Sequence, residues 1–463
     1  MVFSDTPFLF LFLPALLILY YNPFVKSRTF RNIILMLASV FFYAWGEPFF
    51  VFIMLGSIVV NWVIALLMNE NNKKLLLILD LTFNIGIFFV FKYLGFVADN
   101  LSLLFGTKNM AINIALPIGI SFYSFQIMSY VIDVYRKEVE VQKNLFDLVL
   151  YVSFFPQLIA GPIVRYENIA DELENRTETK ADFTQGMIRF VYGLAKKVLI
   201  ADYIGSIVDN VWATDNRTVA LAWIGAIAYT LQIYFDFSGY SDMAIGMGRM
   251  FGFHFRENFN YPYVAKSITE FWRRWHMSLS GWFRDYVYIP LGGNRKGLMM
   301  TYRNMFVVWL LTGIWHGANW TFIAWGLFYF AFLFFEKKYN FAPRLKGFGH
   351  VYTMLVVIFG WILFRSDSIS QAVIYIGQMF GIGAVGFWNA LSLETLTSTW
   401  AVLVVGIIGS FPVKNVFAKL GNRNEKAEEV VNVLNAMWVM IIFMLALFAC
   451  AKATYSPFLY FNF

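Results

Sequence analysis

One titratable ring lies inside an otherwise apolar run, Met305-Phe-Val-Val-Trp-Leu-Leu-Thr-Gly-Ile-Trp-His-Gly-Ala-Asn-Trp320. The ring is His316, and the whole chain has four histidines. A bilayer solvates an ionisable side chain poorly, so such a residue at membrane depth faces a cavity or a partner and marks a candidate site. Gly313 and Gly317 would let the backbone bend or another group approach closely there. A neutral histidine bonded to a neighbouring helix is the alternative.

The composition indicates a membrane protein with several helical spans. Of the 463 residues, 59% are hydrophobic and 14% charged, whereas a soluble domain rarely exceeds about half apolar residues. Apolar segments long enough to cross a bilayer recur along the chain. The net charge of +7 comes from basic residues in particular loops, which is typical of the positive-inside bias and not of nucleic-acid binding. Cys450 is the single cysteine, so an internal disulfide and a cysteine metal site are excluded.

Basic loops predict the orientation of the spans. Four of them can be cytoplasmic together if the N-terminus lies outside. These loops contain Lys26, Arg28 and Arg31; Lys73 and Lys74; Arg136, Lys137 and Lys143; and Lys414, Lys419, Arg423 and Lys426. The predicted spans cover residues 7–22, 31–45, 48–67, 74–95, 116–134, 184–204, 218–237, 350–364, 398–413 and 432–451, with a compound segment at 304–336.

Two segments do not fit as simple crossings. Residues 148–164 contain Pro156, Gly161 and Pro162, and both of their flanks are assigned to the cytoplasm, so we interpret the segment as re-entrant. Residues 304–336 also have basic residues at both ends. That run must enter and return, with a bend near 313–317, which places His316 close to the apex.

The long region 239–303 predicts an amphipathic helix at the cytoplasmic interface. Ser267-Ile-Thr-Glu270 is a capping-box pattern. Aromatic and aliphatic residues then recur at helical spacing as far as Tyr286. His276 falls on this helix, at the edge of the aromatic stripe, and Gly292-Gly293-Asn294 predicts a turn after it.

The polar residues of this apolar chain are the candidates for chemistry. His276 and His316 are the residue type used most often as a general base, although their spacing alone is a weak signal and two histidines are too few for a metal site. Asp236, Ser238 and Asp242 form a second polar patch, for which a structural ion-pair cluster is the alternative. Lys196 and Lys197, within an apolar span, need carboxylates or a polar cavity. Gln126 could bond across helices.

Six motifs, in order along residues 116–326, resemble the membrane-bound O-acyltransferase (MBOAT) family, and most closely its alginate O-acetyltransferase (AlgI-like) branch. Each motif alone is modest, but six in order are specific. They are Leu116-Pro-Ile-Gly-Ile-Ser-Phe-Tyr, Phe155-Pro-Gln-Leu-Ile-Ala-Gly-Pro-Ile-Val-Arg-Tyr166, Tyr234-Phe-Asp-Phe-Ser-Gly-Tyr-Ser-Asp242, Phe271-Trp-Arg-Arg-Trp-His-Met-Ser-Leu-Ser280, Phe283-Arg-Asp-Tyr-Val-Tyr-Ile-Pro-Leu-Gly-Gly-Asn-Arg295 and Trp315-His-Gly-Ala-Asn-Trp320.

The resemblance implies an all-α fold of about eleven spans, with re-entrant and interfacial helices, around a central funnel. It implies a single membrane domain over 1–463, with N-terminal spans in 1–115, the catalytic core in 116–336 and C-terminal spans in 350–463. His316 and His276 match the two family histidines and would be catalytic, with no metal. The other residues expected near the donor or the tunnel are Trp315, Asn319, Arg273, Arg274, Ser280, Asp236, Ser238, Asp242 and Gln126.

The implied reaction moves an acyl group, expected to be acetyl, from a cytoplasmic thioester to a hydroxyl across the bacterial cytoplasmic membrane. The donor would be acetyl-coenzyme A or an acyl-carrier thioester, with no bound cofactor. Membrane lipid, an extracytoplasmic acyltransferase that modifies a polysaccharide, and a cytoplasmic acyl-carrier protein are the expected partners, and nucleic acid is not. D-alanyl transfer to teichoic acid, a transporter or flippase, and a non-catalytic scaffold remain alternatives. A transporter predicts an inverted repeat, and the sequence has none that we find.

Overall fold

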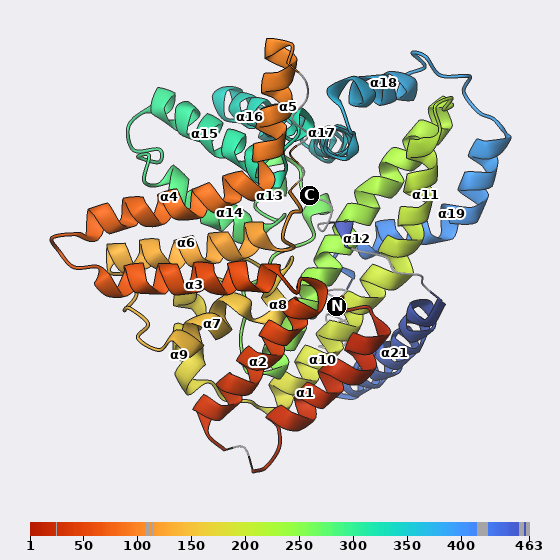
Figure 1. Cartoon of the computed structure of the whole chain (residues 1–463). Coiled ribbons are helices and arrows are strands. Elements are labelled where there is room, and N and C mark those ends of the chain that lie inside the picture. Colours follow the sequence, from red (N-terminus) through yellow and green to blue (C-terminus); the bar gives the residue numbers. More distant parts are fainter. Residues whose placement is uncertain (25, 108–111, 113, 414–424, 453–457, 460–463) are drawn as a thin grey trace. The chain divides into compact units, whose positions relative to one another are not determined.

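The structure is a computed structural model that describes the chain except residues 25, 108–111, 113, 414–424, 453–457 and 460–463 (Figure 1). The described residues form helices and contain no β-strand, which confirms the predicted all-α class. Seven of the described helices are long and apolar enough to cross a membrane; the figure of about eleven spans stays a prediction. They are α2 (Arg28–Gly46), α3 (Phe50–Leu67), α4 (Lys73–Lys92), α12 (Val219–Met250), α17 (Phe348–Arg365), α19 (Ala390–Gly409) and Glu428–Lys452 within α21 (Glu425–Lys452).

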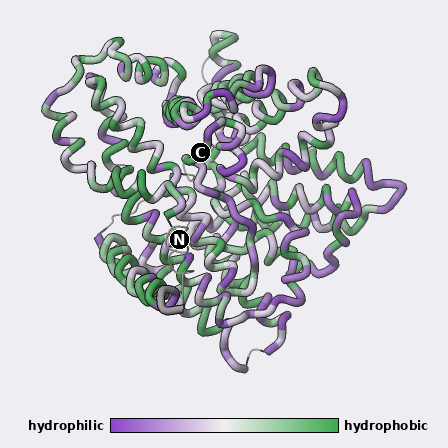
Figure 2. The backbone as a smooth tube through the Cα atoms, turned by 180° about the vertical axis from the view of Figure 1, so that it is seen from behind, coloured by the Kyte–Doolittle hydropathy of each residue, from purple (hydrophilic) through white to green (hydrophobic). Residues whose placement is uncertain are grey.

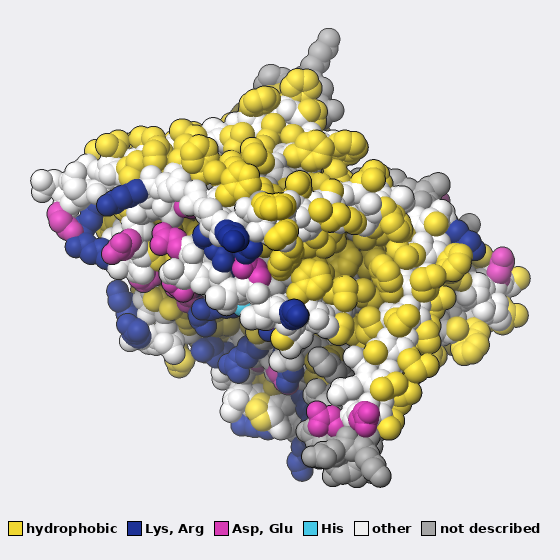
Figure 3. Space-filling view, turned by 90° about the horizontal axis from the view of Figure 1, so that it is seen from below, with side chains coloured by type: hydrophobic (Ala, Val, Ile, Leu, Met, Phe, Trp, Pro, Cys, Tyr) yellow, Lys and Arg dark blue, Asp and Glu magenta, His cyan; other side chains and the backbone are white. Residues whose placement is uncertain are grey.

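The distribution of apolar side chains on these helices is that of a lipid-facing surface. Helix α4 exposes Leu75, Ile78 and Leu79, whereas its polar residues Asp80 and Asn84 are fully buried. Hydrophobic stretches follow the helices, and polar ones gather at connections such as the α3–α4 turn at the right of Figure 2. In the space-filling view, hydrophobic side chains cover broad areas of the visible face, and Lys and Arg gather elsewhere on it (Figure 3). Such a surface is stable in hydrocarbon, where polar groups must find partners inside the protein.

The chain divides into two compact units. The first unit comprises Met1–Phe190 and Met243–Arg256, and the second comprises Val191–Asp242 and Glu257–Phe463. The boundaries between these units differ from those of the predicted segments 1–115, 116–336 and 350–463. The single-domain organisation therefore stays a prediction.

The first unit contains the N-terminal helices. Helix α2 packs on α7, and α3, α4 and α6 pack on one another. The segment predicted to be re-entrant is indeed broken: α7 ends at Ser153, α8 is a single turn, and residues 159–165 are irregular and mostly buried. The remaining helices of the unit are α1 (Leu13–Tyr20), α5 (Leu94–Phe105), α6 (Ile120–Arg136), α7 (Leu145–Ser153), α8 (Phe155–Leu158), α9 (Tyr166–Asn175) and the first part of α10 (Lys180–Ala195).

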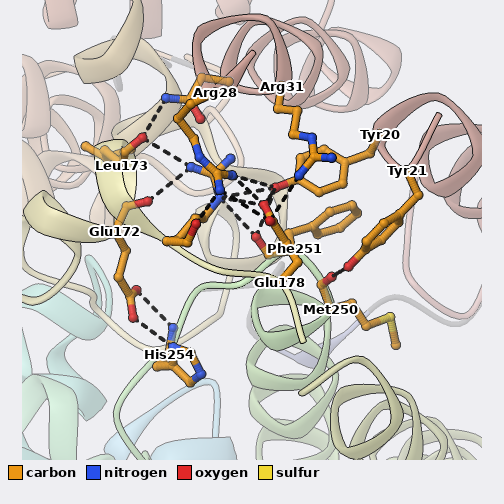
Figure 4. A network of polar contacts seen from close by, with 12 residues as sticks. Tyr20, Tyr21, Arg28, Arg31, Glu172, Leu173, Glu178, Met250, Phe251 and His254 are labelled. Atoms are coloured by element: carbon orange, nitrogen blue, oxygen red, sulfur yellow. Dashed lines mark hydrogen bonds and ion pairs between the residues drawn. The ribbon is translucent and has the colours of Figure 1, made fainter. Parts of the chain in front are cut away.

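One predicted basic loop takes part in a polar network of this unit (Figure 4). Arg28 and Arg31 both form ion pairs with Glu178, and the buried Arg176 donates to the carbonyl oxygen of Phe251 over 3.0 Å. Burial alone would raise the pKa of Glu178, but its hydrogen bonds and ion pairs outweigh burial and lower that pKa to about 2. The network therefore ties α2 to the α9–α10 connection. Most of the predicted basic loop of Lys414, Lys419 and Arg423 lies outside the described residues, as does the side chain of Lys426.

The second unit is built around a helical hairpin. Helices α15 (Leu298–His316) and α16 (Trp320–Tyr339) pack along each other, and α16 also contacts α13 and α17. The core of the unit is rich in large aromatic side chains, among them Trp275, Trp325 and Trp361, each at most 2% exposed. Its other helices are α11 (Asp202–Ala213), α13 (Ile268–Trp272), α14 (Met277–Phe283) and α18 (Ile369–Met379).

The predicted amphipathic helix is two helices. Helix α13 ends at Trp272, and α14 begins only after His276, which has a left-handed backbone with φ of 45°. The prediction of one continuous helix is therefore wrong, because hydrophobic spacing alone cannot show a residue with positive φ. The capping-box prediction is correct for Ser267, whose hydroxyl accepts from the Glu270 N–H over 3.0 Å. The Glu270 carboxylate, however, accepts from the N–H of Lys266.

Candidate functional site

The hairpin of α15 and α16 holds His316 at its bend, as the sequence predicted. His316 is the last residue of α15, and Asn319 begins α16 by accepting a hydrogen bond from the Thr321 N–H over 3.0 Å. The Asn319 amide nitrogen also donates to the carbonyl oxygen of Asp367 over 3.0 Å. A methyl group at Gly313 would meet the α16 backbone, so glycine allows the two helices to approach closely here. The bend is thus fixed by a cap and by backbone packing.

The His316 ring lies in an aromatic cage. It is 5% exposed, and its ring centroid is 4.9 Å from those of Trp315 and Trp325 and 5.1 Å from that of Phe364. All three contacts are edge-to-face, with interplanar angles of 77°, 80° and 83°. Such contacts hold the ring in one orientation while the cage keeps its surroundings apolar. His316 is therefore a buried and oriented imidazole.

His276 is held by a different set of contacts. It is 1% exposed, and its Nδ1 lies 3.1 Å from Oδ1 of Asn258. The ring stands edge-to-face against Phe237, with centroids 4.7 Å apart. Burial lowers the pKa of His276 to about 3, because a charged ring would be desolvated there. His276 is thus a neutral imidazole at ordinary pH.

Trp315 links the two histidines. Its ring centroid is 6.1 Å from that of His276 and 4.9 Å from that of His316. The structure therefore brings both predicted histidines to one aromatic cluster of the second unit, although they lie 40 residues apart in the sequence. Two buried imidazoles beside one indole can accept and return protons.

The profile of the membrane-bound O-acyltransferase family matches residues 137–370. A probable alginate O-acetylase AlgI from Pseudomonas putida is 40% identical, and the match covers all of both chains. A peptidoglycan O-acetyltransferase from Helicobacter pylori is 33% identical over all of this chain and 98% of that protein. A teichoic acid D-alanyltransferase from Bacillus subtilis is 29% identical over 53% of this chain and 68% of that protein.

The chain belongs to the membrane-bound O-acyltransferase family. It is an O-acyltransferase, and its apolar helices fit a multi-pass membrane protein. Both histidines lie within the residues that the family profile matches.

The polar patch of Asp236, Ser238 and Asp242 contains a cluster of ion pairs. Such a structural cluster was the sequence-based alternative to a role in chemistry. The buried Asp236 and the partly buried Asp202 each lie 2.7 Å from Nζ of Lys197, and Asp242 lies 2.6 Å from Nζ of Lys196. Asp236 also accepts from the Leu459 N–H over 2.8 Å. The two lysines in an apolar span thus have the carboxylates that the sequence indicated they need. Ser238 is buried in α12 between the two acidic residues.

The remaining predicted residues differ in their surroundings. Arg273 is exposed, whereas Arg274 forms an ion pair of 2.9 Å with Glu270. Ser280 is exposed on α14, one turn after His276. Gln126 is fully buried on α6, in the first unit.

Three contacts of the histidine cluster were missed from the sequence. Asn258 holds His276, and Trp325 and Phe364 enclose His316. The two aromatic residues are indistinguishable from the other aromatic residues of an apolar chain. Asn258 lies in a polar stretch whose sequence gives no sign that it folds back onto a residue 18 positions later. Within the described residues no group of three or more metal-ligating side chains occurs.

Proposed function

We propose that this enzyme transfers an acetyl group from a thioester on the cytoplasmic side of a bacterial cytoplasmic membrane to a hydroxyl on the other side, for O-acetylation of a polysaccharide. The observation that carries the proposal is the pair of buried histidines on either side of Trp315 in a family of O-acyltransferases. The full-length similarity to an alginate O-acetylase and a peptidoglycan O-acetyltransferase supports acetyl as the acyl group and a surface polysaccharide as the acceptor. Similarity to the D-alanyltransferase covers only about half of the chain, which makes D-alanine the weaker candidate.

In this proposal His316 is the general base. It takes the proton of the attacking hydroxyl as the oxygen bonds to the thioester carbonyl carbon; the carbon–sulfur bond then breaks, and the departing thiolate receives a proton. His276 relays a proton or positions the donor. A buried aromatic surrounding suits this step, since it excludes the water that would hydrolyse the thioester.

The donor and the partners follow from the same proposal. Acetyl-coenzyme A and an acyl-carrier thioester are both acidic, and the exposed cations Arg273, Arg295 and Lys296 would attract either of them to the cytoplasmic side. The product would pass to an extracytoplasmic acyltransferase that modifies the polymer. In this arrangement we place the N-terminus outside, as the basic loops predict.

The proposal is tested by transfer from radiolabelled acetyl-coenzyme A in purified membranes. We expect His316→Ala to lower transfer by about 10²–10⁴-fold, the usual contribution of a general base. The matched control is His350→Gln, since His350 lies on α17 and its Nδ1 lies 3.3 Å from the carbonyl oxygen of Ala265, outside the histidine cluster. Equal transfer by native protein and His316→Ala would contradict the role of His316 and favour a transporter or scaffold. Inactivity of the native protein would redirect the assay to carrier-protein thioesters.

A further inference from the structure

Asn258 is a buried amide whose side-chain oxygen and nitrogen both form hydrogen bonds, beside His276. It is 0% exposed, and its backbone oxygen accepts from the Met277 N–H over 2.9 Å. Its side-chain Oδ1 faces Nδ1 of His276 at 3.1 Å, the Ser278 N–H at 3.2 Å and the Ser278 hydroxyl at 2.8 Å. Its Nδ2 donates to the Ser241 hydroxyl over 3.0 Å. These contacts fix both the position and the orientation of the amide.

The orientation of the amide determines which nitrogen of His276 carries the proton. The backbone N–H of Ser278 can only donate, so the Asn258 atom that faces it must be the oxygen and not the NH2 group. The same oxygen faces Nδ1 of His276, and an oxygen of a primary amide can only accept. Nδ1 must therefore carry a hydrogen. In a neutral ring the lone pair then lies on Nε2.

We propose that Asn258 is a positioning residue that fixes His276 as the Nδ1–H tautomer and so leaves the lone pair of the neutral ring on Nε2, the nitrogen that exchanges a proton during transfer. Asn258 also supports the left-handed backbone of His276, because the Met277 N–H donates to the Asn258 backbone oxygen and so stabilises the chain just after the histidine. A carbonyl group on one ring nitrogen is a common way in which proteins set the tautomer of a functional histidine.

The tautomer assignment stands on geometry alone, but its catalytic consequence rests on the proposed function. In the transfer reaction His276 accepts a proton at Nε2 and returns it, while Nδ1–H stays bonded to Asn258. The imidazolium formed in between still donates from Nδ1, so the hydrogen bond survives the whole cycle. His276 is thereby restricted to the role of a proton acceptor at Nε2 in the resting enzyme.

The first test reads the tautomer directly. The chain has four histidines, so 15N-histidine labelling of the full-length protein in lipid gives four resolvable imidazoles, and His276→Gln assigns the signal of His276. We expect a neutral ring protonated at Nδ1 in the native protein. Asn258→Leu removes the acceptor and should shift the ring toward the Nε2–H form, whereas Asn258→Asp keeps an oxygen there and should preserve Nδ1–H.

Three results would overturn the tautomer assignment. They are a native His276 protonated at Nε2 or at both nitrogens, an unchanged tautomer in Asn258→Leu, and an Nε2–H tautomer in Asn258→Asp. The native and Asn258→Asp measurements decide the matter even if Asn258→Leu fails to fold.

The second test separates positioning from the proposed function. Asn258→Leu should lower kcat for acetyl transfer by about 10–100-fold, the usual effect of losing a group that orients a functional side chain. Asn260→Ala is the matched control, since Asn260 is an exposed asparagine two residues away. Normal transfer by Asn258→Leu with an altered tautomer would refute the positioning role. Failure of the proposed function would instead appear as normal transfer by His316→Ala.

Discussion

Removing the carboxylate of Glu336 should destabilise the second unit and disable its site. Glu336 is 5% exposed on α16, and it accepts from the Ile268 N–H over 2.6 Å, the Thr269 N–H over 2.9 Å and the Thr269 hydroxyl over 2.6 Å. Two of these donors are the first N–H groups of α13, which have no partner within their own helix. Each buried N–H that loses its acceptor costs about 1–3 kcal/mol, so Glu336→Ala should cost about 2–6 kcal/mol in unfolding free energy.

The matched control is Glu270→Ala in the same region. Glu270 pairs with Arg274 four residues later in a part-exposed position, and such pairs contribute less than about 1 kcal/mol. Thermal unfolding of both detergent-solubilised variants, followed by acetyl transfer at a temperature where both are folded, compares the two carboxylates. We expect a large fall in melting temperature and in transfer for Glu336→Ala only, because α13 leads directly into His276. Equal melting temperatures for the two variants would refute the reasoning about orphaned helix donors.

Three further predictions concern the remaining polar and glycine contacts. Because the folded-state pKa of Glu178, about 2, lies below its ordinary value of 4.5, its contribution to stability is complete above pH 4.5 and is lost as pH falls toward 2. Denaturant unfolding of the native protein between pH 4.5 and 2 should show the free energy of unfolding falling with pH. In Glu178→Gln this part of the pH dependence should be absent. Gly313→Ala should lower the free energy of unfolding by about 1–3 kcal/mol, because the added methyl group would overpack against α16. Gly86 has open space around it, so Gly86→Ala should leave the melting temperature unchanged or slightly higher. Equal losses of stability in the two variants would contradict close packing of α15 on α16. Asp80→Asn should raise the melting temperature, because the Asp80 carboxylate is fully buried and forms no ion pair with a cation within the described residues, whereas a neutral amide avoids the cost of a buried charge; a lower value would contradict this.

The sequence predicted the fold where hydrophobicity and chain breakers determine it. Apolar length identified the helices that could span a membrane, and the density of proline and glycine in 148–164 correctly predicted a broken segment. The hairpin bend near His316 followed from charge at both ends of an apolar run. The broken helix at His276 could not be predicted, because its left-handed backbone is accompanied by a hydrogen bond from the Met277 N–H to the Asn258 oxygen, a contact that hydrophobic spacing does not reveal.

The candidate site was predictable in its titratable residues and not in their partners. A histidine in an apolar chain is conspicuous because the membrane penalises it, so composition alone singles out His316. The groups that orient an imidazole are a carbonyl oxygen and aromatic edges, and such groups are common throughout this chain. Only three-dimensional packing distinguishes Asn258, Trp325 and Phe364 from residues of the same type elsewhere.

The two histidines are constrained by different physics, which bears on how they can divide the reaction. Hydrogen bonding fixes the tautomer of His276, since Asn258 offers an acceptor that tolerates no other arrangement. Aromatic packing fixes the plane of His316, but edge contacts with Trp325 and Phe364 do not by themselves select one tautomer. A ring that aromatic edges hold in one plane suits a base that takes a proton and releases it without changing its orientation. A ring with one nitrogen permanently bonded suits a partner that takes and returns the proton at a single position. Changes at Asn258 should therefore act on His276 and not on His316. Changes at Trp315, which contacts both rings, should affect the proton transfers at both histidines.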